Sequence, residues 1–510
     1  MTAPTRDLVE ATDPSTPLRP VGPQRPGSEA RPSAAVAAAR AAARRRGAAR
    51  WTRRSVTAMV TITMLAYPFL LTDPRSPWAN LDRSETIALY SDGVSGSGSV
   101  LPTLVPAGTT ADYLPGSRVL DPGPADPDAL AVAEAAAAES RAWLASGTVP
   151  GGDGPYADMA EGALLDMRAL LLNDGASVAG WSARWRYVWP RDASFVAVAM
   201  ATTGHPDEAI EILSFLQRVQ HRNGSFEARY LPDGSGPPDD RGIQADGTGW
   251  ALWATQSVLA SMPDADRLAA ARALRPLIDR STEHLLDLTD RRDSLPRASS
   301  DFWEVGESRL TLGTAAPILS GLEAAARLNG ALGQRLPAEA AAERASDLHG
   351  AIVDRFGPRF ARYTDGLQRD AAGAFLLPPF QPEPVPGALA SWRASAREMS
   401  RPAGGLAPGA GWKKDGISWT PQTSLYGLTA AWAGDTAAAR SWLTWLDAHR
   451  TSSGAIPEKV LGDGSPAAVA PLSWSAACVV LAVAQLDEVE AAQALARPES
   501  PLRLPVSQGR

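Results

Sequence analysis

The chain has 510 residues, 45% of them hydrophobic, so it can bury one large core or two moderate ones. Its net charge of -7 excludes a basic footprint for nucleic acid over the whole molecule, and a single cysteine, Cys478, excludes an intrachain disulfide. The five histidines are scattered without metal-ligand spacing, so we expect no metal and no cofactor. Tryptophan (16) outnumbers phenylalanine (9) and tyrosine (8). Many tryptophans fall between predicted helices, where a carbohydrate cleft would use them better than a core.

The N-terminal part of the chain has the pattern of a membrane anchor. Residues 1–54 are rich in Pro, Ala and Arg, with seven arginines between Arg40 and Arg54, and we expect a disordered basic cytoplasmic tail. Residues 55–72 carry no charge over 18 positions, the lower limit for a transmembrane helix. The basic block before them predicts a single-pass cell-membrane protein with its main domain outside the cytoplasm. A cleaved signal is the alternative.

The rest of the chain divides into a spacer, a helical region and a short tail. Residues 73–126 are rich in Pro, Gly and Ser, and we expect an extracytoplasmic spacer with one short strand at 85–90. Residues 491–510 are expected to form a disordered C-terminal tail. In the region between the spacer and the tail, helical periodicity and helix-end signals predict helices at 127–146, 156–172, 192–203, 206–220, 247–261, 265–289, 309–329, 337–355, 386–399, 420–433, 435–449 and 471–486.

These helices are joined alternately by short turns and long loops. This alternation suggests inner and outer helices that pair and close a ring, so we predict an all-α (α/α)6 toroid over residues 127–490. The long loops would then gather at one end. They share tryptophan, glycine and an acid, and place the candidate residues Trp189, Arg191, Asp192, Asp246, Gly247, Trp303, Glu304, Trp419, Glu458 and Trp474 at that end.

The segment 185–193, WRYVWPRDA, carries the densest group of these residues. Pro190 suits the first turn of a helix, and an acid there suits the helix dipole. Arg191 and Asp192 should therefore lie at a helix start beside aromatic rings. Rings and forked donor–acceptor pairs fit a sugar, which offers an apolar face and a rim of hydroxyls. The alternative is an ordinary helix start with a surface ion pair.

The acids in the loops suggest glycoside hydrolysis, which needs two carboxylates. One protonates the leaving oxygen, and the other activates water or attacks directly. Each acid has a structural alternative: Asp192 and Asp246 as helix N-terminal acids, Glu304 as a surface charge, and Glu458 as the partner of Lys459. Glu307, near Arg309, is expected to be a solvated charge. The loop 233–240 could be a calcium loop or, as we expect, a plain surface loop.

Four motifs in order resemble those of glucoamylase-type enzymes, family 15 of the glycoside hydrolases. They are WRYVWPRDA, DGTGWALW, SSDFWE, and GAIPEKV followed by PLSWSAA, and the likeness spans roughly residues 155–485. The resemblance implies a membrane-anchored bacterial member with an (α/α)6 barrel. It makes Glu304 the general acid and Glu458 the general base of an inverting reaction. Arg191 and Asp192 would hold the terminal sugar, with Trp189, Trp303 and Trp474 as walls and Asp246 and Gly247 near the same pocket.

The resemblance leaves three functions open. The first is an inverting, exo-acting α-glucosidase acting on α-1,4- or α-1,6-glucans or on trehalose. The second is a catalytically weak glycan-binding or envelope-associated protein that keeps the sugar pocket. Val305, where many family members carry a second acid, favours this alternative, and retention of both glutamates opposes it. The third is a hydrolase or lyase acting on another envelope polysaccharide. The expected partners are an oligosaccharide and the membrane.

Overall fold

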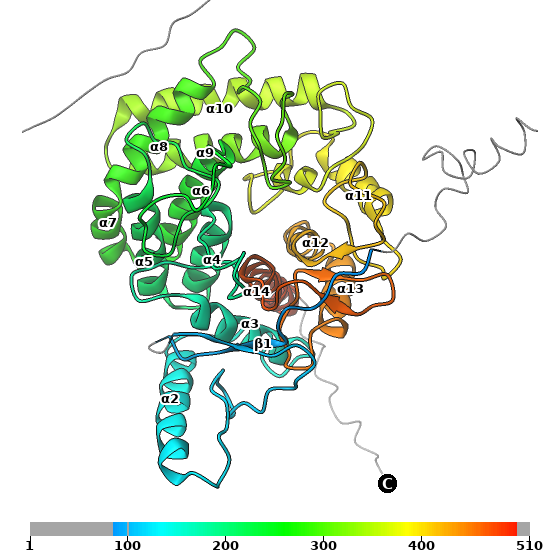
Figure 1. The fold of residues 1–510 in the computed structure, drawn as a ribbon. Coiled ribbons are helices and arrows are strands. Elements are labelled where there is room, and N and C mark those ends of the chain that lie inside the picture. The colour runs from blue at the N-terminus through cyan, green and yellow to red at the C-terminus, as the bar shows by residue number, and fades with distance from the viewer. Residues whose placement is uncertain (1–84, 99–100, 497–510) are drawn as a thin grey trace, which may run out of the picture. The chain divides into compact units, whose positions relative to one another are not determined.

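The computed structural model describes residues 85–98 and 101–496, all of which belong to one compact unit that begins at Asp82. Helices dominate this unit (Figure 1). Their bounds are α2 Pro127–Ser146, α3 Ala157–Leu170, α4 Pro190–Thr202, α5 Pro206–Val219, α6 Asp246–Ser261, α7 Asp264–Ala273, α8 Arg275–Leu288, α9 Leu312–Ala331, α10 Arg335–Phe356, η1 Ala371–Leu376, α11 Ala388–Met399, α12 Thr420–Trp432, α13 Thr436–Ala448 and α14 Ser473–Ala496.

The predicted mostly helical fold is confirmed for the described residues, with three differences in the elements. The predicted helix 265–289 is two helices, α7 and α8, because Pro276 begins a new helix after a break at Leu274. Helix α14 continues to Ala496, beyond the predicted end at 486 and into the expected C-terminal tail. The short 3₁₀ helix η1 has no counterpart among the predicted elements.

Six elements contact one another in a closed circuit. Helix α4 packs on α6, α6 on α9, α9 on η1, η1 on α12, α12 on α14, and α14 again on α4. These are the inner elements expected of six helical hairpins, except that the fourth is the single 3₁₀ helix η1. Six further helices cover them from outside: α3 on α14, α5 on α4, α8 on α6 and α9, α10 on α9, α11 on η1, and α13 on α12 (Figure 1).

The inner helices are buried on all sides over most of their length, as expected of a helix enclosed by other helices. Every residue of α4 from Pro190 to Ala201 is buried. Glycines let α6 and α9 approach closely, since a Cβ on Gly249 would lie 2.1 Å from the Pro317 carbonyl oxygen. A Cβ on Gly321 would likewise lie 2.6 Å from the Gly249 Cα. Gly249, the second glycine of DGTGWALW, therefore allows this close packing of α6 on α9.

Two small sheets accompany the helices. Strands β3 (Ser418–Trp419), β4 (Lys459–Val460) and β5 (Pro466–Ala467) form an antiparallel sheet in the order β3-β4-β5, with Trp419 opposite Lys459. Strands β1 (Gly93–Ser95) and β2 (Thr103–Val105) form an antiparallel pair. The first sheet positions two residues of the candidate site.

The described part of the expected spacer packs on the helical unit and carries strands β1 and β2, so it is not a spacer. The Asp92 carboxylate accepts hydrogen bonds from the Ser452 backbone N–H and hydroxyl, at 3.2 and 2.7 Å. The predicted strand 85–90 is also wrong, because only Leu89 makes a β-bridge there, to Ala468. Apolar residues such as Val94 and Val105 are buried, so this segment forms part of the fold.

Among the residues that the structure describes, no helix is long and apolar enough to cross a membrane. The expected cytoplasmic tail at 1–54 and the expected anchor at 55–72 lie outside the described residues, as do 73–84 of the expected spacer and 497–510 of the expected tail.

Candidate active site

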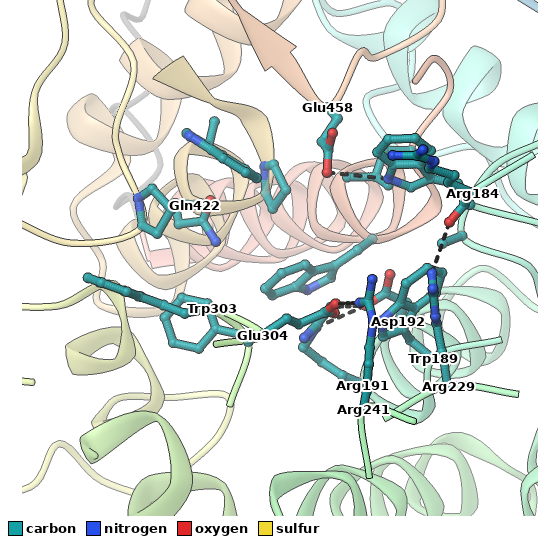
Figure 2. A pocket seen from close by; sticks show the side chains of 18 of the residues that line it. Arg184, Trp189, Arg191, Asp192, Arg229, Arg241, Trp303, Glu304, Gln422 and Glu458 are labelled. Carbon is teal, nitrogen blue, oxygen red and sulfur yellow. Dashed lines mark hydrogen bonds and ion pairs between the residues drawn. The ribbon is translucent and has the colours of Figure 1, made fainter. Parts of the chain in front are cut away.

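A cavity of about 300 Å³ lies among the loops that lead from outer to inner helices (Figure 2). Every lining residue comes from such a loop or from the first turn of the inner helix that follows it. This is the arrangement expected if the long loops gather at one end of the helical ring. Of the residues proposed from the sequence, the cavity is lined by Trp189, Arg191, Asp192, Trp303, Glu304, Trp419, Glu458 and Trp474.

Arg191 and Asp192 form a buried ion pair in the first turn of α4. The Asp192 carboxylate accepts from Arg191 Nε at 2.9 Å and Nη2 at 2.8 Å, and the two residues are 7% and 3% exposed. The Arg191 guanidinium also lies 4.3 Å from the centre of the Trp474 ring. Burial raises the pKa of Asp192 to about 6, against the opposing charge of Arg191. The pair is thus a fixed element of the cavity and not a surface ion pair.

Glu304 lies at the cavity beside two arginines. Its carboxylate contacts Arg241 Nη1 and lies 3.8 Å from Arg191 Nη2 (Figure 2). Its backbone has a φ of 54°, a left-handed conformation that is uncommon for residues other than glycine. Such strained positions cluster at functional sites. The side chain is 21% exposed, so it can reach a ligand in the cavity.

Glu458 faces Glu304 from the opposite side of the cavity (Figure 2). The carboxylate accepts from Trp185 Nε1 at 3.3 Å and pairs with Lys459 Nζ at 3.2 Å. Its backbone is held between Val469 and Thr420, beside β4. Burial raises the pKa of Glu458, and the Lys459 charge and the Trp185 hydrogen bond oppose that effect. A carboxylate whose pKa is raised toward the working pH is a better base.

Tryptophans form the walls between the two glutamates. Trp303 meets Trp412 edge to face with ring centres 4.9 Å apart, and Trp412 meets Trp419 in the same way at 5.5 Å. Trp189 and Trp474 are almost fully buried at the inner end of the cavity, next to Asp192. Aromatic faces with a few fixed polar groups between them suit a sugar ring.

Two of the proposed residues do not line the cavity. Asp246, 1% exposed, begins α6 behind Arg191, and Gly247 packs on Pro190, where a Cβ would lie 3.4 Å from that ring. Burial raises the pKa of Asp246 to about 7, although the Arg191 charge lowers it. Both residues therefore pack behind the first turn of α4. They do not line the cavity, so they are not placed to contact a sugar directly.

The structure also adds residues that sequence reasoning left out. Arg229 and Arg241 line the cavity from the loop between α5 and α6, where both contact the Asp239 carboxylate. Trp185 and Gln422 line it as well, one within the first motif and one in the first turn of α12. No motif marks the two arginines, because they flank the segment 233–240, which is rich in Gly, Pro and Asp and is typical of a plain surface loop.

Glu307 corrects another expectation. Its side chain is 6% exposed, and its carboxylate pairs with Arg362 at 2.7 Å and accepts from the Tyr363 hydroxyl. Arg362 also binds Asp301 and Asp370, both buried, so Glu307 belongs to a buried ionic network under Trp303 and is not a solvated charge.

Within the described ranges, no three His, Cys, Asp or Glu side chains are grouped so that they could hold a metal ion.

The fold is shared with known glycosidases, and among them with glucoamylases. A glycosidase solved in complex with glucose superposes with a TM-score of 0.55 and 22% identity, over 65% of this chain and 96% of that one. A bacterial glucoamylase complexed with acarbose gives 0.58 and 18%, over 71% and 60%. The glucoamylase of Saccharomycopsis fibuligera gives 0.51 and 16%, over 64% and 93%.

Sequence comparison adds one short match. A 94-residue segment is 31% identical to an uncharacterized glycosyl hydrolase from Methanocaldococcus jannaschii. The match covers 18% of this chain and 15% of the length of that relative. No family model matches the chain.

Proposed function

We propose that this chain is a glycoside hydrolase, an inverting, exo-acting α-glucosidase of glucoamylase type. One observation carries the proposal: Glu304 and Glu458 face each other across a cavity that is lined by tryptophans and ends on the buried Arg191–Asp192 pair (Figure 2). The glucoamylases and the glucose-bound glycosidase that share the fold support this class of reaction.

In the proposed reaction, the terminal glucose lies at the inner end of the cavity. Arg191 and Asp192 hydrogen-bond its hydroxyls, and Trp189 and Trp474 pack against it. Glu304 gives its proton to the glycosidic oxygen as the bond from that oxygen to the anomeric carbon breaks. Glu458 takes a proton from a water molecule, whose oxygen bonds to the anomeric carbon from the opposite face. The products are glucose of inverted configuration and the shortened sugar.

Burial of Trp189 and Asp192 in the cavity lining supports exo action, because a sugar chain that reached these two residues would have no exposed surface to continue along. Incubation of the full-length chain with maltotetraose, isomaltotriose and trehalose tests the proposal through release of glucose. A variant with both glutamates changed to glutamine is the control. Release by the wild type alone supports hydrolysis and identifies the linkage, and no release from any of the three by the folded protein counts against it.

A second candidate, a glycan-binding protein with weak catalysis, is favoured by the contact between Glu304 and Arg241. This ion pair occupies the carboxylate that a general acid must present to the glycosidic oxygen. Sugar binding without turnover by the wild-type chain would select this candidate.

The location outside the cytoplasm, anchored through residues 55–72, stays a proposal that the uncharged segment and the arginines before it support. Membrane fractionation of cells that express the full chain tests it. Recovery of the chain in the soluble fraction would contradict anchoring.

A further inference from the structure

The cavity carries more positive charge than a neutral sugar requires. Four arginines line it, Arg184, Arg191, Arg229 and Arg241. Arg191 is paired with Asp192, and Arg229 is paired with Asp239 and donates to the Arg184 carbonyl oxygen at 3.0 Å. The guanidinium groups of Arg191 and Arg229 are buried, and each is paired with an aspartate that is not proposed to take part in proton transfer.

The other two arginines are different. Arg241 is 37% exposed and binds two carboxylates through different nitrogens, Asp239 through Nε at 3.2 Å and Glu304 through Nη1. The exposed side chain of Arg184 makes no ion pair with any residue in the described ranges. Arg241 therefore depends on Glu304 for half of its pairing, and Arg184 has no carboxylate at all.

This pairing cannot persist through the reaction. Glu304 must be protonated before it can act as an acid, and a protonated carboxyl no longer balances the guanidinium charge of Arg241. A sugar hydroxyl can accept a hydrogen bond from the guanidinium, but it brings no negative charge and cannot bind through two parallel hydrogen bonds as a carboxylate does. An oxyanion on the ligand would replace Glu304 at Nη1 and release it to take up a proton.

We propose that the substrate carries an oxyanion, a carboxylate or a phosphate, on the sugar that follows the bond to be cleaved, and that Arg241 binds this group. The position follows from Glu304, which contacts Arg241 and, as the proposed acid, must lie at the leaving oxygen. Arginine suits this task because its planar guanidinium binds either anion through two parallel hydrogen bonds. The inference rests on the proposed hydrolytic function and names the substrate class for the same site.

Two matched pairs of substrates test the inference on the full-length chain. The first pair is maltose and glucosyl-α-1,4-glucuronate, and the second is trehalose and trehalose 6-phosphate, so that the carboxylate and the phosphate are tested separately. We expect kcat/KM for at least one anionic member to exceed that of its neutral partner by on the order of tenfold or more. In Arg241→Gln this ratio should fall to near one, and Arg241→Lys, which keeps the charge, should retain part of it. Arg335→Gln, a surface variant on α10, should leave the ratio unchanged.

Calorimetric binding of the same four sugars separates this inference from the proposed function. Hydrolysis of the neutral sugars with no preference for either anion overturns the inference and keeps the hydrolase. Binding of an anionic sugar that depends on Arg241, without hydrolysis of any sugar, supports the anion site and overturns the hydrolase. If the chain hydrolyses none of the four sugars and binds neither anionic sugar preferentially, both the hydrolase and the anion site are overturned.

Discussion

Replacement of Asp246 by asparagine should make the protein more stable at neutral and alkaline pH. Asp246 is buried behind Arg191, and burial raises its pKa from an ordinary value of 3.8 to about 7. The folded state therefore holds the proton more tightly than the unfolded state between these two values. Stability that depends on this proton is complete below pH 3.8 and is lost as the pH rises through about 7.

The size of the effect follows from the pKa shift. Three pH units correspond to about 4 kcal/mol of unfolding free energy, at 1.36 kcal/mol each, as an upper limit. Asparagine has nearly the same shape and no charge to bury. The difference in unfolding free energy, Asp246→Asn minus wild type, should therefore rise between pH 4 and pH 8 by about 2–4 kcal/mol.

Urea unfolding followed by tryptophan fluorescence, at half-unit steps of pH, measures this difference. Asp233→Asn is a matched control, because Asp233 is exposed on the loop between α5 and α6 and hydrogen bonds from Ser235 lower its pKa. The control difference should not rise with pH. If the Asp246→Asn difference is flat or falls from pH 4 to pH 8, then Asp246 is ionised at neutral pH and the account of the buried turn is refuted.

Three further predictions concern the catalytic groups. Glu304→Gln and Glu458→Gln should each lower kcat on a glucoside substrate by about 10²–10⁴-fold. The leaving group of α-glucosyl fluoride needs no proton, so on this substrate Glu304→Gln should recover most of its rate and Glu458→Gln should not. Equal losses of rate on the fluoride would contradict the division of roles. Asp192→Asn should weaken glucose binding by about 10–100-fold, since a hydrogen bond to a charged group contributes about 1.5–3 kcal/mol, and an unchanged calorimetric affinity would remove Asp192 from the sugar site. Trp185→Phe should raise the pKa of Glu458, because it removes the N–H donor that stabilises the carboxylate in the wild type. The acidic limb of the profile of kcat/KM against pH should therefore move to higher pH. A shift to lower pH would contradict Glu458 as the base.

The inner helices and the acids of the loops could be predicted because both leave local patterns. Pro190 and Asp192 mark a helix start, and the motif around Glu304 and the one around Glu458 place each glutamate between an outer and an inner helix. The structure brings both glutamates to one cavity with six tryptophans. Hydrophobic periodicity and turn signals predict that these loops gather at one end, and the choice of the two glutamates as acid and base comes from the resemblance.

The charges around Glu304 could not be predicted from local sequence. Arg241 is 63 residues away along the chain, and the loop that carries it has no hydrophobic periodicity. The place of Asp246 behind Arg191 depends on the packing of α6 on α4, which a helix-start motif does not specify. The packing of residues 91–98 and 101–120 likewise depends on distant partners such as Ser452, which a Pro- and Gly-rich composition typical of a linker does not reveal.

The configuration of the first product tests the central claim most directly. The full-length chain is mixed with an α-linked substrate that it cleaves, and the anomeric protons are followed by NMR during the first minutes, before mutarotation mixes the two anomers. If Glu458 activates water on the face opposite the bond that Glu304 protonates, the first glucose signal is that of the β-anomer. If α-glucose appears first, the configuration is retained, and the assignment of Glu458 as a base that activates water is contradicted.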